Sequence, residues 1–182
     1  MTKAIQEHYW MILATSVLLC TFVVIGTFRA RTQPHMDEVF SYNLSNQYGF
    51  PLLHQDYFHH WHDGEYYRDA LTVQPEERFD YRRVCYNLSL DVHPPLYYFS
   101  LHTICSLFPN QFSWWFAFSI NIVFYIGSII LIFMIGNALG MAKSRSLLAA
   151  VFWGLSSAGI NEVCFLRMYM MLTFIMLCVT YR

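Results

Sequence analysis

The chain has 182 residues, of which 56% are hydrophobic and only 13% charged, and its formal net charge is −1. Ordinary soluble domains carry about 25% charged residues, so this composition excludes such a domain and indicates an integral membrane protein. The near-neutral charge gives no basis for binding nucleic acid.

The first predicted element is a membrane-spanning helix. Residues 10–28 form an uncharged run of 19 residues, close to the ~20 needed to cross a bilayer. A signal peptide would have a shorter apolar stretch, a more basic start and a better cleavage site than Thr27-Phe28-Arg29. We therefore assign residues 1–28 to an N-terminal segment with an uncleaved first transmembrane helix.

Residues 29–93 form a polar loop between apolar stretches. This segment holds ten of the twelve acidic residues, six of the eleven basic residues and six of the eight histidines, so lysine, arginine and carboxylate charges sum to 6 − 10 = −4. It is also rich in aromatic residues, in which disordered segments are poor, and amphipathic rings favour the membrane interface. The sequence therefore predicts a folded extramembrane loop on the bilayer, with short helices over residues 36–47 and 78–89.

The remaining predicted elements are apolar helices of different lengths. Residues 94–109 begin with Pro94-Pro95, and about 14 apolar residues at 1.5 Å each reach only ~21 Å, short of a ~30 Å hydrocarbon core. Residues 113–136 form a full span of 24 residues, and residues 137–146 form a polar loop. Residues 147–182 are predicted to form two further transmembrane helices around a short turn near 161–168.

Basic residues decide how these helices cross the membrane. If residues 94–109 lie flat in the interface, Lys143 and Arg145 face the cytoplasm, as the positive-inside rule requires. The same topology returns Glu162 and Arg167 to the side of the 29–93 loop, whose own arginines largely escape the rule because the loop is longer than about 60 residues. We therefore predict an all-α integral membrane fold with about four transmembrane helices, an extracytoplasmic loop and an interfacial helix.

Asp37 and Glu38 form an acidic pair nine residues after the first transmembrane helix. Charged groups at a membrane are costly to desolvate, so they are candidate functional residues by default. A carboxylate here either acts as general base on an acceptor hydroxyl or holds a divalent cation that neutralises a phosphate. The alternative is a solvated helix start, where the helix dipole favours acidic side chains.

The block Asp91-Val92-His93-Pro94-Pro95-Leu96-Tyr97-Tyr98 closes the loop. Its two prolines end any preceding helix and pre-set the first turn of the next one. His93 is therefore expected at a helix N-terminus, where anions such as phosphate are attracted, and Asp91 is placed to orient it. The alternative is a capped interfacial helix with Tyr97 and Tyr98 at the membrane–water boundary.

A run of histidines and carboxylates, residues 54–65, has the composition of a metal site. Its spacing matches no HExxH or HxxEH pattern, and the adjacent His59 and His60 cannot point the same way on a strand or helix. We therefore predict a polar, pH-sensitive surface there and assign no metal ligands. Asn43 and Asn87 each begin an Asn-Leu-Ser sequon, which matters only in a eukaryote.

Three of these motifs, taken in order, resemble the start of the GT-C glycosyltransferases. They are the acidic pair, the Asp-x-His-Pro-Pro-Leu-Tyr-Tyr block and residues 162–169, EVCFLRMY, which are similar to a short membrane-level Glu/Ser…Arg-x-Tyr signature of that family. The closest kinds are the family 39-type protein mannosyltransferases and the bacterial lipid A aminoarabinose and sugar transferases. The resemblance covers the whole chain as three anchors.

The resemblance implies an enzyme that transfers a sugar from a polyprenyl-phosphate donor to a lipid, glycan or protein acceptor on the extracytoplasmic side. The residues it implies are Asp37 as the base or acceptor contact and His93 and Arg167 at the donor phosphate. To these we add Glu38 as a catalytic candidate that supports Asp37, and Asp91, which orients His93, and Tyr169 as candidates for substrate binding. The resemblance also implies an interfacial Pro-Pro helix. The family's remaining helices and second large extracytoplasmic region are missing, so we expect the N-terminal portion of a longer enzyme, and activity of this portion alone stays open.

Two other classes stay open on the sequence. One is a non-catalytic membrane scaffold or glycan-binding subunit that uses the aromatic residues of the loop. The other is a transporter or channel built on Glu162 and Arg167 as a buried pair. The expected location is the bacterial plasma membrane with the loop outside, or the endoplasmic reticulum in a eukaryote, and the sequence defines no cofactor beyond the divalent cation considered above.

Overall fold

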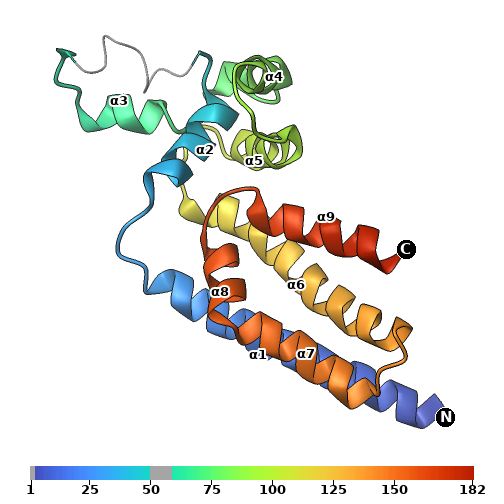
Figure 1. Cartoon of the computed structure of the whole chain (residues 1–182). Coiled ribbons are helices and arrows are strands. Elements are labelled where there is room, and N and C mark those ends of the chain that lie inside the picture. The colour runs from blue at the N-terminus through green and yellow to red at the C-terminus, as the bar shows by residue number, and fades with distance from the viewer. Residues whose placement is uncertain (1–2, 50–58) are drawn as a thin grey trace. The chain divides into compact units, whose positions relative to one another are not determined.

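The computed structural model describes residues 3–49 and 59–182 (Figure 1). In these residues every regular element is a helix and no strand occurs, which confirms the predicted all-α class. The helices are α1 (Lys3–Arg29), α2 (Met36–Asn46), α3 (Gly64–Asp69), α4 (Tyr81–Ser89), α5 (Pro95–Leu107), α6 (Trp114–Ala138), α7 (Lys143–Leu155), α8 (Ser157–Cys164) and α9 (Tyr169–Tyr181). A 3₁₀ turn, Pro75–Glu77, lies between α3 and α4.

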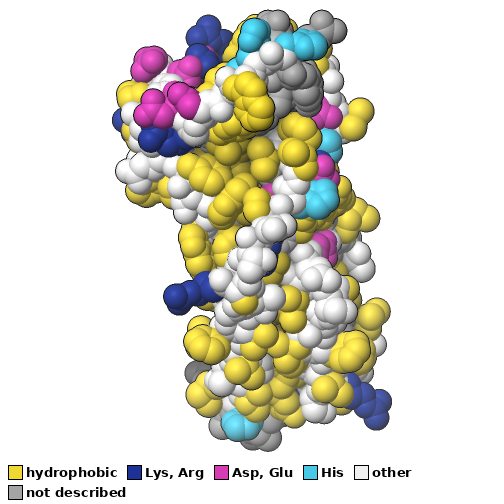
Figure 2. All heavy atoms as spheres, turned by 90° about the vertical axis from the view of Figure 1, so that its left-hand side faces the viewer, with side chains coloured by type: hydrophobic (Ala, Val, Ile, Leu, Met, Phe, Trp, Pro, Cys, Tyr) yellow, Lys and Arg dark blue, Asp and Glu magenta, His cyan; other side chains and the backbone are white. Residues whose placement is uncertain are grey.

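The chain divides into two compact units. Unit 1 combines Met1–Thr32, Asn121–Phe165 and Tyr169–Arg182, and unit 2 combines Gln33–Ile120 with the tripeptide Leu166–Met168. Unit 1 therefore holds α1 and α7–α9, unit 2 holds α2–α5, and α6 contributes its first residues to unit 2 and the rest to unit 1. On the face shown in Figure 2, acidic and histidine side chains lie mainly on unit 2.

Within residues 3–49 and 59–182, two helices are long and apolar enough to cross a membrane, namely His8–Arg29 within α1 and the whole of α6. A third span exists if α7 and α8 count as one, because the two are apolar together and bend by 53° at a short break. The remaining apolar helix, α9, has 13 residues, fewer than the ~20 that a straight crossing needs. The helices thus support a membrane protein with two or three spans, and the fourth predicted span stays a prediction.

The break between α7 and α8 leaves backbone groups that polar side chains of unit 1 satisfy. Ser156 has an extended backbone and caps the first turn of α8 with its hydroxyl. At the far end of α8, Arg31 donates to the Cys164 carbonyl at 2.6 Å and Asn121 donates to the Val163 carbonyl at 3.1 Å. The Ser156 hydroxyl thus caps the helix at the break, whereas Arg31 and Asn121 satisfy carbonyls at the opposite end of α8.

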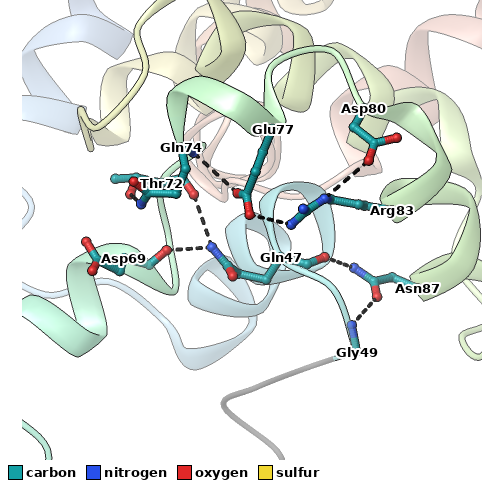
Figure 3. Close-up of polar contacts among 9 residues, drawn as sticks. All are labelled: Gln47, Gly49, Asp69, Thr72, Gln74, Glu77, Asp80, Arg83 and Asn87. Atoms are coloured by element: carbon teal, nitrogen blue, oxygen red, sulfur yellow. Dashed lines mark hydrogen bonds and ion pairs between the residues drawn. The ribbon is translucent and has the colours of Figure 1, made fainter.

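In unit 2, α2, α4 and α5 pack on one another. Asn87 of α4 holds the end of α2, because its Nδ2 donates to the carbonyls of Leu44 and Gln47 at 3.0 and 2.6 Å. Its Oδ1 accepts from the Gly49 amide at 3.0 Å, as Figure 3 shows. One fully buried side chain therefore satisfies three backbone groups where α2 ends.

The helices of unit 2 agree with the sequence pattern except at two places. The helices expected over 36–47 and at Pro94-Pro95 occur as α2 and α5. The helix expected over 78–89 begins only at Tyr81, because Phe79 has a positive φ of 59°, which a helix does not allow. The short helix α3, which Asp63 caps by accepting from the Tyr66 amide, was not predicted.

His102 of α5 is a fully buried imidazole, and neither of its ring nitrogens has a hydrogen-bond partner within the described part of the chain. The edge of the Tyr81 ring packs near it, with the centroids 5.5 Å apart. Burial lowers the pKa of His102 below its usual range. The nearby Ser45 backbone and Asp80 carboxylate raise the pKa, but by less than burial lowers it. The folded protein therefore favours the neutral imidazole.

This burial makes the stability of unit 2 depend on pH. Since the pKa of His102 is lower in the folded than in the unfolded chain, its contribution is complete above the unfolded value of about 6.5 and is lost as the pH falls below it. We expect His102→Leu to flatten the fall in unfolding free energy below pH 6.5 by up to ~1.4 kcal/mol per pH unit. Chemical unfolding of both proteins in detergent from pH 8 to pH 5 measures how the unfolding free energy depends on pH. Identical pH profiles would show that His102 does not cause this dependence.

Candidate functional site

The acidic pair lies in the first turn of α2. His35 precedes the helix, and its Nδ1 accepts from the Asp37 amide at 3.2 Å. The Glu38 carboxylate reaches back to accept from the His35 amide at 2.8 Å, which completes a capping box. The Asp37 side chain is 44% exposed, whereas Glu38 is fully buried, so the two carboxylates have different environments.

The histidine of the Pro-Pro block lies directly before α5. Pro94 is the N-cap and Pro95 is the first helical residue, as the sequence predicts. The His93 side chain is mostly buried, and its Nδ1 lies 2.8 Å from an Asp91 carboxylate oxygen. The aspartate therefore fixes the orientation of the imidazole ring.

Arg167 comes to the same place from the far end of the chain, on the tripeptide Leu166–Met168 of unit 2. Its Nη2 lies 2.7 Å from His93 Nε2, and its Nη1 donates to the Asp37 carbonyl at 2.9 Å. A guanidinium only donates hydrogen bonds, so Nε2 of His93 must accept. His93 is then a neutral imidazole with its proton on Nδ1, donated to Asp91, and Arg167 is the cation of the group.

The charge of Arg167 is not directly compensated. The residue is 5% exposed, yet no carboxylate of residues 3–49 or 59–182 forms an ion pair with it. Its Nε is buried and has no hydrogen-bond partner in the same residues. A buried guanidinium with one unused donor is costly unless an anion neutralises it, so Arg167 is the group of this site that would attract an anionic ligand.

Tyr97 and Tyr98, at the start of α5, belong to the core of unit 2 and not to its surface. The Tyr98 hydroxyl contacts the Met168 sulfur at 3.8 Å. The Tyr97 hydroxyl is buried, and no described residue forms a hydrogen bond with it. Burial raises the pKa of Tyr97 well above its usual range, and the nearby Glu38 carboxylate raises it further. The boundary role considered for these tyrosines is therefore wrong, and Tyr97 is a buried donor that sequence reasoning missed.

The other candidate residues lie elsewhere. Tyr169 begins α9 in unit 1, where its ring stacks on Phe165. Glu162 is also in unit 1 and accepts a hydrogen bond from Thr173. Arg167 donates to Asp37 and His93, and Glu162 accepts from Thr173. The two residues therefore bond to other groups and do not form the buried ion pair that the transporter hypothesis requires.

The histidine-rich run falls partly outside the described residues, which exclude 50–58. In its described part, His62 stacks on the Tyr66 ring with the centroids 3.9 Å apart. Over residues 3–49 and 59–182, no group of three His, Cys, Asp or Glu side chains is arranged to hold a metal ion.

Unit 2 thus brings together a half-exposed carboxylate, a buried cation and an oriented imidazole at a helix N-terminus. A cation stabilises a leaving phosphate, and a carboxylate takes a proton from an attacking hydroxyl. Comparison with protein-family models, with curated proteins and with solved structures finds no match to this chain.

Proposed function

We propose that this chain forms the donor side of a GT-C-type membrane glycosyltransferase, which moves a sugar from a polyprenyl-phosphate donor to an extracytoplasmic acceptor. The observation that carries the proposal is Arg167, a buried guanidinium with no ion pair in residues 3–49 and 59–182 and an unused N–H. The donor phosphate supplies the anion that this group lacks. The N-terminus of α5, beside His93, favours the same charge.

Each residue of the site has a separate role in the proposed reaction. The acceptor hydroxyl attacks the anomeric carbon, and its proton passes to the Asp37 carboxylate. The bond between the sugar carbon and the phosphate oxygen breaks, and its electron pair stays on the phosphate, where Arg167 stabilises the charge. Asp91 holds the His93 ring, which in turn holds the guanidinium.

Binding of a short-chain polyprenyl-phosphate sugar to the detergent-purified protein tests the proposal. We expect Arg167→Ala to weaken binding at least tenfold, because charge-assisted hydrogen bonds to a buried anion are lost. Arg82→Ala is the matched control, since it removes an equal charge from a side chain of unit 2 that is 94% exposed. Absence of binding by the wild type, or equal binding by all three proteins, would reject the proposal.

A further inference from the structure

Glu38 has contacts that distinguish it from the other acidic residues. It is completely buried, and its two carboxylate oxygens accept from two backbone amides. Oε2 accepts from the His35 amide and Oε1 from the Leu166 amide, both at 2.8 Å. The second bond joins positions 128 residues apart in the chain, so Glu38 closes the long-range contact of α2 with the tripeptide Leu166–Met168.

The same two segments are joined by a second bond in the opposite sense. Arg167 donates from Nη1 to the Asp37 carbonyl at 2.9 Å. Residues 37–38 and 166–167 therefore each give one side chain and one backbone group to the other, and we call this pair of bonds the double clasp. Since Leu166 is bonded at its amide, the adjacent Arg167 leaves the backbone from a fixed position.

Glu38 is unsuited to proton transfer or substrate contact. Complete burial separates its carboxylate from an acceptor hydroxyl, and each oxygen already binds an amide. Asp37 has the opposite properties, because its side chain is half exposed and only its backbone joins the double clasp.

We propose that Glu38 is a positioning residue, which sets the place of Arg167 through the Leu166 amide and does not itself touch the substrates. This inference rests on the proposed function, because it assigns the donor phosphate to Arg167. It gives Glu38 a positioning role in place of the catalytic role considered in the sequence analysis. The acidic pair is thereby divided: one carboxylate faces the acceptor and the other places the cation that binds the donor.

Glutamine is the decisive replacement, since it keeps the length of the side chain and removes the charge. A glutamine offers one carbonyl oxygen, and its amide group would face the second backbone N–H, donor against donor. We expect Glu38→Gln to weaken binding of the polyprenyl-phosphate sugar about tenfold, as loss of one charged hydrogen bond does. Glu65→Gln, on an exposed side chain of α3, is the matched control and should bind as the wild type does.

A double-mutant cycle separates positioning from general destabilisation. If Glu38 acts through Arg167, Glu38→Gln has no further effect on binding in an Arg167→Ala protein. If the loss is a general one, the two fold-changes multiply. Multiplied effects would overturn the inference, and so would a folded Glu38→Gln protein that binds the probe normally.

A measurement without ligand keeps this inference separate from the proposed function. His93 Nε2 accepts from Arg167, so its ¹⁵N chemical shift in histidine-labelled protein reports the position of the guanidinium. We expect Glu38→Gln to move this signal towards its value in Arg167→Ala, whether or not the sugar probe binds. Should Glu38→Gln fail to fold, Glu38→Asp serves, because its shorter carboxylate cannot reach both amides; an unmoved His93 signal in the folded variant would overturn the inference.

Discussion

Replacing Asp37 by asparagine is expected to lower the rate of sugar transfer by about a hundredfold or more, the usual effect of removing a general base. Asparagine has the same size, and it keeps the backbone carbonyl that Arg167 binds and the amide that His35 caps. The double clasp and the start of α2 therefore survive, and only the half-exposed carboxylate is lost. Binding of the donor should be nearly unchanged. The rate of sugar transfer, measured with donor and acceptor in proteoliposomes, should fall.

The control for Asp37→Asn is Asp69→Asn, which removes another exposed carboxylate from unit 2. It should leave transfer unchanged. If Asp37→Asn also left transfer unchanged, Asp37 would not be the base. Substitutions of the exposed, stacked rings of Tyr48 and Tyr86 that then abolished binding of a glycan would favour the non-catalytic scaffold.

Asn87→Ala is expected to lower the unfolding free energy of unit 2 by about 2–4 kcal/mol. The variant loses three hydrogen bonds and leaves the Leu44 carbonyl without its partner where α2 ends. It also leaves the Gln47 carbonyl and the Gly49 amide, both drawn in Figure 3, without theirs. Chemical unfolding in detergent, followed by the fluorescence of the tryptophans, measures the change.

Gln111→Ala is the control for Asn87→Ala, because it removes an exposed amide side chain of the same unit. It should change stability by less than about 0.5 kcal/mol. Equal stability of the Asn87 variant and the wild type would show that the bonds of Asn87 are replaced by water at no cost.

The same contacts change the interpretation of the two Asn-Leu-Ser sequons. The side-chain nitrogens of Asn43 and Asn87 are buried and donate to backbone carbonyls. An amide in that state is closed to a glycosylating enzyme once the protein has folded. The tripeptide pattern is local in sequence, whereas the burial that decides its use comes from residues tens of positions away.

Helices that the sequence specifies by local chemistry were predicted well. The prolines before α5 and the long apolar run of α6 define these elements without help from the rest of the fold. The sequence did not predict the break at Ser156, because residues 147–159 are apolar throughout and serine is tolerated inside a helix. Its capping role depends on the bend itself, because the hydroxyl accepts from the Gly159 amide only when α8 begins anew after Ser156.

The site was predicted as a set of residues but not as a set of contacts. Sequence order indicated that Asp37, His93 and Arg167 belong together, and the structure places all three in unit 2. The sequence did not predict that Arg167 would donate to His93, which makes the histidine a neutral acceptor. Nor did it predict that Glu38 would be buried. Such partners lie 74 to 130 positions apart, beyond the reach of any helical or strand periodicity.

The tripeptide Leu166–Met168 completes unit 2 although residues on both sides of it belong to unit 1. A ribosome adds Leu166 only 128 residues after Glu38, when α6, α7 and α8 have already been made. Until then the emerging chain has the acidic pair and the Pro-Pro block but lacks Arg167. The bonds that Leu166 and Arg167 make to residues 37–38 of unit 2 can therefore form only after three further helices have been synthesised.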